Sequence, residues 1–388
     1  MRLLLVTQDF PPAVGGIQTY SKALADRFAG STEHFGVLAP AQRGSAAIDA
    51  ELEYPVFRIP VPSDGMRYAL LPYLSYACLK GGFRVAFLAQ WYSGAAASLA
   101  KRLGLLDRVY AAAHGQELLR VPAEGQWLGR AYVRHRQRVL PALDGFFPVS
   151  RYTASLLEGL EVPAGRVHVV YNGTDVERFA ITADERAGLA AWRREHGLGS
   201  GPLLLTAARL VRRKGVDAVL AALPAIARKV PGVHYAVVGS GPERDNLEQL
   251  ARQLGVRERV SFLGQLPDRD VVLAYNACDV FVMPARFEHP SVEGFGLVFR
   301  EANACGKPVV GTRTGGIADA IEDGRTGLLV EPDALEALTN AVLRLLEDPA
   351  YAARLGEQGR ALVTESGTWQ HAADRMLDVM RAGAEDEA

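Results

Sequence analysis

Residues 279–301, DVFVMPARFEHPSVEGFGLVFRE, combine an apolar run, an irregular loop and the start of an amphipathic segment. The run 279–283 (DVFVM) is typical of a buried strand. After it, Glu293 and Glu301 stand eight residues apart around two glycines, where the pattern predicts the first turn of a helix with free backbone N–H groups. Such N–H groups can face a diphosphate, and carboxylates can accept hydrogen bonds from sugar hydroxyls. The stretch therefore predicts a nucleotide-sugar site.

The same alternation of short apolar runs and longer amphipathic ones extends over the chain in both directions. In the first half, the expected strands are residues 3–7, 35–39, 56–59, 85–88, 109–113, 146–149 and 167–170. In the second half, they are residues 203–207, 235–238, 260–263, 279–283, 308–311 and 328–330. Alternation of this kind predicts parallel sheets covered by helices on both faces. We expect an α/β protein with two doubly wound, Rossmann-like domains that face each other across a cleft.

A length of 388 residues is too great for one ordinary core and fits two domains of similar size. The polar stretch 175–202 has no strand signal and is a natural linker. Trp369 and the apolar positions after it predict a C-terminal helix. We therefore expect domains at 1–180 and 181–367, with residues 368–388 returning to the first domain.

Composition excludes several classes of protein. The apolar fraction of 49% and the charged fraction of 22% are typical of a globular chain, and the formal net charge of -1 gives no reason to expect a nucleic-acid partner. Three cysteines far apart in the sequence argue against both a disulfide framework and a zinc site. The N-terminal apolar run is too short for a signal peptide. We expect a cytoplasmic protein.

Two loops of the first half lie where ligands bind in such sheets, beyond the carboxyl ends of the strands. Gly15 and Gly16 follow the first strand and precede a helix, so they can present N–H groups to a phosphate or form an ordinary tight turn. His114 follows the strand 109–113 and faces the same edge, where a role in capping the structure is an equally good interpretation.

Two further loops belong to the second half. Arg209 and Lys214 are five residues apart at a strand-to-helix turn and can hold a diphosphate from two sides, whereas Arg212 and Arg213 fit a solvated basic turn. The segment Gly239-Ser240-Gly241 is half of a dinucleotide fingerprint, because Arg244 stands where the third glycine belongs. This favours proximity of Gly239 to a phosphate or base over NAD binding.

In order along the chain, these elements resemble the family 4 retaining glycosyltransferases of the GT-B fold, and the resemblance spans almost the whole sequence. The residues that carry it are Gly15, Gly16, His114, Arg209, Lys214, Glu293 and Glu301, with supporting motifs at 144–150, 172–175 and 315–316. Within the family, residues 9–18 and 285–292 look most like bacterial mannosyltransferases that act on phosphatidylinositol mannosides. Asp319 departs from the Glu that the family commonly has there.

The resemblance implies roles for these residues. Catalytic roles fall to His114 near the 6-hydroxyl of the transferred sugar, to Arg209 and Lys214 at the diphosphate, and to Glu293 at the sugar hydroxyls. It implies that Glu301 binds the ribose. The further donor-binding residues are Gly15, Gly16, Gly239, Gly294, Phe295, Gly296 and Leu297.

The resemblance also implies the overall reaction. The nucleotide sugar is a substrate, GDP-mannose being favoured over a UDP-sugar, and neither a cofactor nor a metal ion takes part. On the acceptor side it points to Asp9 and Asn172.

The first domain carries two segments that are both basic and apolar, residues 66–84 and 130–138. They fit helices that contact an anionic membrane surface to reach a lipid acceptor, and they better fit helices packed on the sheet with solvated arginines.

Other activities share this architecture. A UDP-sugar-dependent glucosyl- or N-acetylglucosaminyltransferase is the principal alternative, followed by a sugar-nucleotide epimerase or a phosphorylase of the same shape. A nicotinamide-dependent oxidoreductase would need a complete glycine fingerprint. A binding module without catalysis is disfavoured because both cations and both carboxylates are present.

Overall fold

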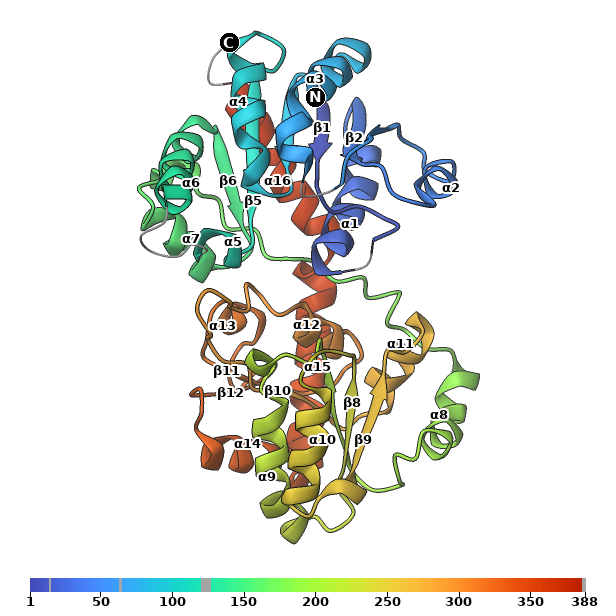
Figure 1. Cartoon of the computed structure of the whole chain (residues 1–388). Helices are drawn as coiled ribbons and strands as arrows, with labels where there is room; N and C mark the ends of the chain where they lie inside the picture. The colour runs from blue at the N-terminus through green and yellow to red at the C-terminus, as the bar shows by residue number, and fades with distance from the viewer. Residues whose placement is uncertain (14, 63–64, 120–126, 386–388) are drawn as a thin grey trace. The chain divides into compact units, whose positions relative to one another are not determined.

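The computed structural model describes residues 1–13, 15–62, 65–119 and 127–385. The described residues form two compact units, each with one six-stranded parallel sheet. Unit 1 consists of Met1–Asn172 and Trp369–Ala388, and unit 2 of Gly173–Thr368. Figure 1 shows the helices that cover each sheet. The boundary between the units lies slightly before the expected residue 180.

Unit 1 is a doubly wound sheet with strand order β3-β2-β1-β4-β5-β6. Its strands are β1 (Arg2–Val6), β2 (His34–Pro40), β3 (Val56–Ile59), β4 (Val85–Leu88), β5 (Arg108–Ala113) and β6 (Gly145–Pro148). All neighbours pair in parallel. The strand order reverses between β1 and β4, and ligands of such sheets bind beside this topological switch point.

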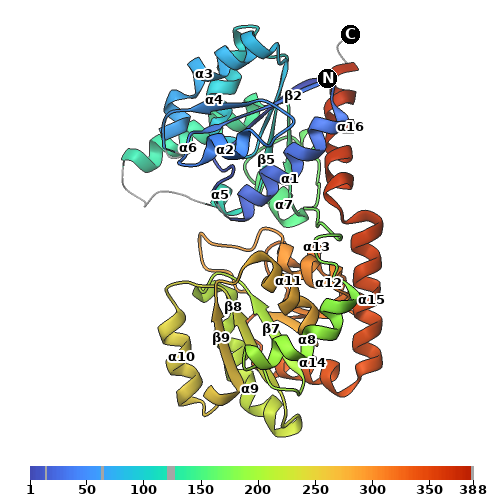
Figure 2. The same ribbon diagram turned by 90° about the vertical axis from the view of Figure 1, so that its right-hand side faces the viewer.

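Helices of unit 1 such as α1 (Gly16–Ser31) bury one apolar side against this sheet. The helices of the unit are α1, α2 (Ser45–Asp49), α3 (Met66–Gly81), α4 (Gly94–Arg102), α5 (Gln116–Leu119), α6 (Trp127–Val139), α7 (Arg151–Glu158) and α16 (Trp369–Glu385). The C-terminal helix α16 packs beside α1, where the ring of Trp369 meets Tyr20 edge to face at 5.8 Å (Figure 2). The expected return of the C-terminal segment to the first domain is thus part of the fold.

Unit 2 repeats the topology of unit 1. Its strands are β7 (Leu203–Ala207), β8 (His234–Val238), β9 (Val260–Gly264), β10 (Val280–Met283), β11 (Val309–Thr312) and β12 (Gly327–Val330). Their order is β12-β11-β10-β7-β8-β9. When the strands are counted from β7, this is the strand order of unit 1 read from the other edge of the sheet. The switch point therefore lies between β7 and β10.

The helices of unit 2 enclose a core of aliphatic and aromatic side chains on both faces of the sheet. They are α8 (Ala183–Glu195), α9 (Val216–Lys229), α10 (Arg244–Gln253), α11 (Asp268–Ala277), α12 (Leu297–Ala304), α13 (Ile317–Ala320), α14 (Leu335–Glu347) and α15 (Pro349–Ser366). Strands such as β7 and β10 are buried along their whole length because helices cover both faces. The runs predicted as strands in the second half are all confirmed.

One expected strand of the first half is not a strand. Val167 forms only an isolated bridge with Phe146, and two backbone bonds, from His168 to Phe146 and from Val170 to Pro148, attach this segment to the edge of β6. The apolar run 167–170 is thus an extended edge segment whose pairing is too sparse for a ladder.

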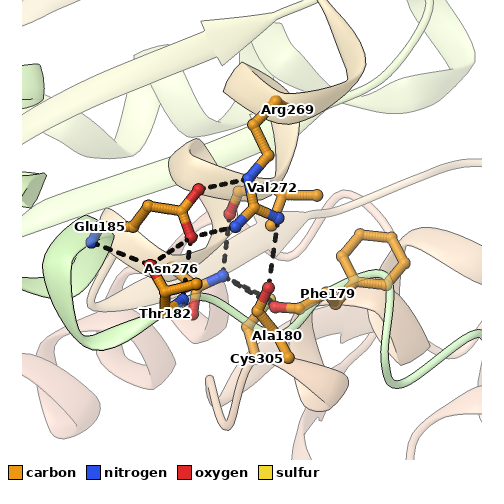
Figure 3. Close-up of polar contacts among 8 residues, drawn as sticks. All are labelled: Phe179, Ala180, Thr182, Glu185, Arg269, Val272, Asn276 and Cys305. Carbon is orange, nitrogen blue, oxygen red and sulfur yellow. Dashed lines mark hydrogen bonds and ion pairs between the residues drawn. The ribbon is translucent and has the colours of Figure 1, made fainter.

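The polar stretch expected as a linker contains helix α8 and is fastened to unit 2 (Figure 3). Thr182 and Glu185 cap its N-terminus reciprocally in a capping box. Glu185 also pairs with Arg269 of α11. Asn276 Nδ2 donates to the carbonyl oxygens of Phe179 at 3.1 Å and Val272 at 2.9 Å. The sequence predicts a linker here because the polar residues of the segment form helix caps and ion pairs and do not contribute to a hydrophobic core.

Candidate functional site

The turn after β7 lies at the switch point of unit 2. It runs through Arg209 and a short 3₁₀ turn, η5 (Arg212–Lys214), to Gly215, which begins α9. Gly215 has φ +73°, and a Cβ there would come 2.0 Å from the carbonyl oxygen of Pro284, directly after β10. Only glycine lets these two backbones meet so closely. The turn that carries Lys214 is thereby pressed against the loop that leads to Glu293.

The Glu293 backbone is fixed by a second turn, the one after β11. The N–H of Gly316 donates to the Glu293 carbonyl oxygen at 2.9 Å. Gly315 has φ +54°, and a Cβ there would come 2.3 Å from the same oxygen. This close packing explains the second glycine pair of the sequence, and it holds Glu293 at the switch point.

Three charged side chains meet there. Glu293 Oε2 accepts from Lys214 Nζ at 2.5 Å and from Arg213 Nη1 at 2.8 Å, and the exposed fractions of the three side chains are 15% for Glu293, 11% for Lys214 and 21% for Arg213. Burial alone would raise the pKa of Glu293, but Lys214 and Arg213 outweigh it and lower the pKa to about 2. Glu293 is therefore a carboxylate at every physiological pH, and the cluster carries one net positive charge.

Beside this cluster lies the N-terminus of α12. Gly296 precedes the helix, no side chain caps it, and its first turn has no acidic residue. Phe295 is buried, with 2% of its surface exposed, so the segment from Gly294 to Leu297 can offer a ligand its backbone rather than this ring. Uncapped N–H groups at a helix N-terminus, next to a net positive cluster, favour a diphosphate.

Glu301 lies further along α12 and is held by a buried tyrosine. Tyr275 of α11 donates its hydroxyl hydrogen to Glu301 Oε2 at 2.7 Å. Burial raises the pKa of Glu301, and the bond from Tyr275 acts in the opposite direction. Since a carboxylate can accept several hydrogen bonds, the remaining lone pairs of Glu301 can receive hydroxyl groups.

In unit 1, His114 lies directly after β5 and faces the switch point of its sheet. Its Nε2 is 2.9 Å from the carbonyl oxygen of Ala89, which follows β4. Because a carbonyl oxygen can only accept, Nε2 carries the hydrogen, and in the neutral ring Nδ1 is an acceptor. The ring packs edge to face on Tyr20 at 4.8 Å. His114 thus has a fixed tautomer and ring orientation.

Three of the remaining predicted residues of unit 1, Asp9, Gly15 and Gly16, lie at the start of α1 or contact it. Gly15 precedes this helix without a side-chain cap, and a Cβ on Gly16 would meet nothing within 4 Å, so the backbone there is open to a ligand. Asp9 Oδ1 accepts from Gln18 Nε2 at 2.8 Å. Asn172 closes the first long segment of unit 1, and its Oδ1 is buried with no donor among the described residues.

The structure brings some predicted residues together and separates others. Lys214 and Glu293 are in direct contact. The Arg209 side chain is exposed and forms no side-chain hydrogen bond or ion pair with any described residue. The N–H of Gly239 donates to the Gly264 carbonyl oxygen at 2.7 Å and is therefore not available to a phosphate. Arg213, interpreted from sequence as one of two solvated arginines, is instead part of the cluster. Its neighbour Arg212 is 73% exposed and pairs with Glu288.

No group of three or more His, Cys, Asp or Glu residues that could hold a metal ion occurs among the described residues. None of the described helices is long and apolar enough to cross a membrane.

Two family models match the chain, one on each half. Residues 14–178 match the model described as Glycosyltransferase Family 4, and residues 190–362 match Glycosyl transferases group 1. A "GDP-mannose-dependent alpha-(1-6)-phosphatidylinositol monomannoside mannosyltransferase" of Mycolicibacterium smegmatis is 34% identical over 97% of this chain and 98% of its own. The chain belongs to the family 4 glycosyltransferases. It is a hexosyltransferase, and the predicted GT-B fold is confirmed.

Other relatives of this glycosyltransferase agree. A "GDP-mannose-dependent monoacylated alpha-(1-6)-phosphatidylinositol monomannoside mannosyltransferase" of Corynebacterium glutamicum is 31% identical over 98% of both chains. The crystal structure of Anabaena HepE in complex with UDP superposes with a TM-score of 0.79 at 21% identity, covering 98% of this chain and 100% of that one. At this identity the superposition establishes the shared fold.

Proposed function

We propose that this glycosyltransferase transfers mannose from GDP-mannose to a hydroxyl group of a phosphatidylinositol mannoside, with retention of anomeric configuration and without a metal ion. The observation that carries the proposal is full-length similarity, at 34% identity, to an enzyme whose name states this donor and acceptor class. The cluster of Arg213, Lys214 and Glu293 supports it, because one net positive charge beside an uncapped helix suits a diphosphate.

In this proposal unit 2 binds the donor. Arg209 and Lys214 neutralise the diphosphate, and N–H groups from Gly294 to Leu297 complete the anion site. A phosphate oxygen would compete with Glu293 for Lys214. Arg213 would remain bonded to Glu293, so the buried carboxylate would still be paired when it accepts hydrogen bonds from mannose hydroxyls. Glu301, oriented by Tyr275, receives the ribose hydroxyls.

Unit 1 supplies the acceptor side. His114 Nδ1 accepts a hydrogen bond from a hydroxyl of the transferred mannose, because Nε2 is already bonded to Ala89. Gly16 offers its N–H to the diphosphate, and Asp9 and Asn172 lie with the acceptor.

The reaction breaks the bond between the anomeric carbon and the phosphate oxygen, and forms one between that carbon and the acceptor oxygen on the same face. The departing phosphate takes the proton of the acceptor hydroxyl. The protein then contributes orientation and stabilisation of the charge that builds up on the leaving diphosphate.

A lipid acceptor requires contact with a membrane surface, and the helices α3 and α6 suit it. Arg130, Arg134 and Arg138 of α6 are exposed. Arg136 of the same helix is buried and donates to the Leu118 carbonyl oxygen at 2.6 Å, so it supports the fold and is excluded from this surface. Basic residues near anionic lipids contribute about 1 kcal/mol each.

The test is a panel of GDP-mannose, UDP-glucose and UDP-N-acetylglucosamine, each measured by thermal shift and by transfer of labelled sugar to phosphatidylinositol monomannoside. A ligand at one hundred times its dissociation constant adds about 2.7 kcal/mol of stability. We expect stabilisation and transfer with GDP-mannose alone, undiminished in excess EDTA, and an α-linked product by NMR. Transfer from a UDP-sugar, or isomerised donor without an acceptor, would overturn the proposal.

A further inference from the structure

Unit 1 contains a cavity of about 410 Å³ away from His114 and the glycine pair. It lies between α3 and the strands β2 and β3, and its lining residues are Leu38, Phe57, Arg58, Pro72, Tyr73 and Tyr76. The volume is within the range of small-molecule sites. Tyr76 is 58% exposed, so the cavity opens to the surface beside it.

The walls of the cavity are almost entirely carbon. The rings of Phe57 and Tyr76 meet edge to face at 6.4 Å, and Leu38 is fully buried beneath them. Among the described residues of the lining, Arg58 alone is charged. Its guanidinium forms a bidentate pair with Asp49, at 2.7 Å and 2.9 Å, which leaves no uncompensated charge. Such a cavity favours an apolar ligand.

Arg58 also connects the cavity to the proposed acceptor loop. Its Nη2 donates to the Pro11 carbonyl oxygen at 2.9 Å, and its guanidinium lies over the ring of Phe10 at 5.5 Å. Both residues directly follow Asp9. Arg58 therefore contacts both the cavity and the loop at the switch point of this sheet.

We propose that this cavity receives one hydrocarbon chain of the lipid acceptor. The inference rests on the proposed function, which supplies an acceptor with acyl chains. Withdrawal of a chain from the bilayer into a carbon-lined cavity exchanges one apolar environment for another, so the acceptor can approach the loop of Asp9 without exposing the chain to water. Tyr76, exposed by 58% on α3, continues the apolar surface outward from the cavity.

The experiment compares phosphatidylinositol monomannoside in detergent micelles with its deacylated, water-soluble counterpart, at saturating GDP-mannose. Tyr76→Asp places a charge at the mouth of the cavity. Leu79→Asp is the matched control, because it adds the same charge to the same helix outside the lining. We expect Tyr76→Asp to raise the KM for the acylated acceptor about tenfold, with no change for the deacylated one, and Leu79→Asp to change neither.

Equal effects of the two variants, or an equal effect of Tyr76→Asp on both acceptors, would overturn the inference in favour of general surface contact. A second measurement does not depend on transfer. Crystals of the whole chain are soaked with lysophosphatidylinositol that carries a brominated acyl chain. An anomalous bromine peak in the cavity supports the inference, and a peak elsewhere or none contradicts it. Transfer to neither acceptor, with bromine in the cavity, would mean that the proposed function fails while the acyl site stands.

Discussion

The switch points of the two sheets differ in chemistry although their topologies are the same. In unit 2, two cations and one carboxylate converge between β7 and β10. In unit 1, the corresponding place between β1 and β4 holds the Ala89 carbonyl group and the ring of His114. The same backbone architecture thus presents a charged site in one unit and a hydrogen-bonding site in the other, which shows that the loops after the strands determine the chemistry.

This contrast has an energetic consequence. A charged cluster can stabilise the charge on a departing diphosphate, whereas neutral groups orient hydroxyls. Variants of unit 2 should therefore weaken binding of the nucleotide itself. Variants of His114 in unit 1, which is proposed to contact the sugar, should leave nucleotide affinity unchanged and slow sugar transfer.

The largest effect is expected from Lys214→Ala. It removes the cation that we propose contacts the diphosphate, and preorganised groups of this kind contribute roughly 10²–10³-fold to rate. We expect kcat/KM for GDP-mannose to fall by about that factor, measured by initial rates. Arg212→Ala is the control, since Arg212 is 73% exposed and pairs with Glu288 rather than with Glu293. Wild-type rates in Lys214→Ala would contradict the assignment of the cluster.

Arg213→Met should reduce kcat/KM less and should also destabilise the fold. It removes one of two partners of a largely buried carboxylate, at a cost of roughly 1–2 kcal/mol after allowance for partial exposure. Chemical denaturation at pH 7 measures this loss.

The same variant has a pH signature. In the wild type, the Glu293 pKa is lowered from 4.5 to about 2 on folding, so its contribution to stability is complete above pH 4.5 and is lost as the pH falls toward 2. In Arg213→Met the pKa of Glu293 lies closer to 4.5, so less stability is lost on acidification. The stability difference between the two proteins should therefore shrink between pH 5 and pH 3. A constant difference would show that Arg213 acts through packing alone.

His114→Phe tests the other side of the comparison. Phenylalanine keeps the ring contact with Tyr20 but removes both ring nitrogens. We expect kcat to fall about tenfold through loss of one oriented hydrogen bond, while the dissociation constant of GDP, which lacks the sugar, stays unchanged. Isothermal titration with GDP measures the second quantity. Weakened GDP binding would mean that unit 1 contributes to nucleotide affinity.

The smallest effect is expected from Tyr275→Phe. Glu301 loses the hydroxyl that orients it, and we expect GDP to bind about fivefold more weakly, or about 1 kcal/mol. Tyr235→Phe is a matched control, because Tyr235 is also buried and its hydroxyl contacts Thr206, away from Glu301. Equal losses of GDP affinity in both variants would assign the effect to general destabilisation of unit 2.

The fold could be predicted from sequence because buried parallel strands are short apolar runs with few alternatives. The exception, residues 167–170, has the composition of a strand, and its sparse pairing depends on the edge of β6, which no local pattern reveals. The segment around α8 is the converse case, because a polar run that predicts a linker is part of a folded unit. Its polar residues are committed to caps and ion pairs with α11 that exist only in three dimensions.

The candidate site was predicted in part. Spacing at strand ends identified Lys214 and Glu293, and the structure joins them. Arg213 was missed because adjacent arginines in a turn look alike in sequence, and only folding shows that one points to Glu293 while Arg212 points to solvent. Tyr275 was missed because it is one of many apolar positions of its helix, and its contact with Glu301 crosses between helices.

The bond between His114 Nε2 and Ala89 limits which substrates the ring can recognise. Because Nε2 is already bonded, the neutral imidazole presents the lone pair of Nδ1. A group that binds there must therefore be a hydrogen-bond donor. A mannose methylated on the oxygen that faces the ring has no hydrogen to donate, so its lone pairs would repel that of Nδ1. An amino group in place of that hydroxyl could still donate a hydrogen bond. If His114 contacts the sugar as proposed, the Ala89 carbonyl group thereby determines which hydrogen-bonding groups of the sugar the ring can recognise.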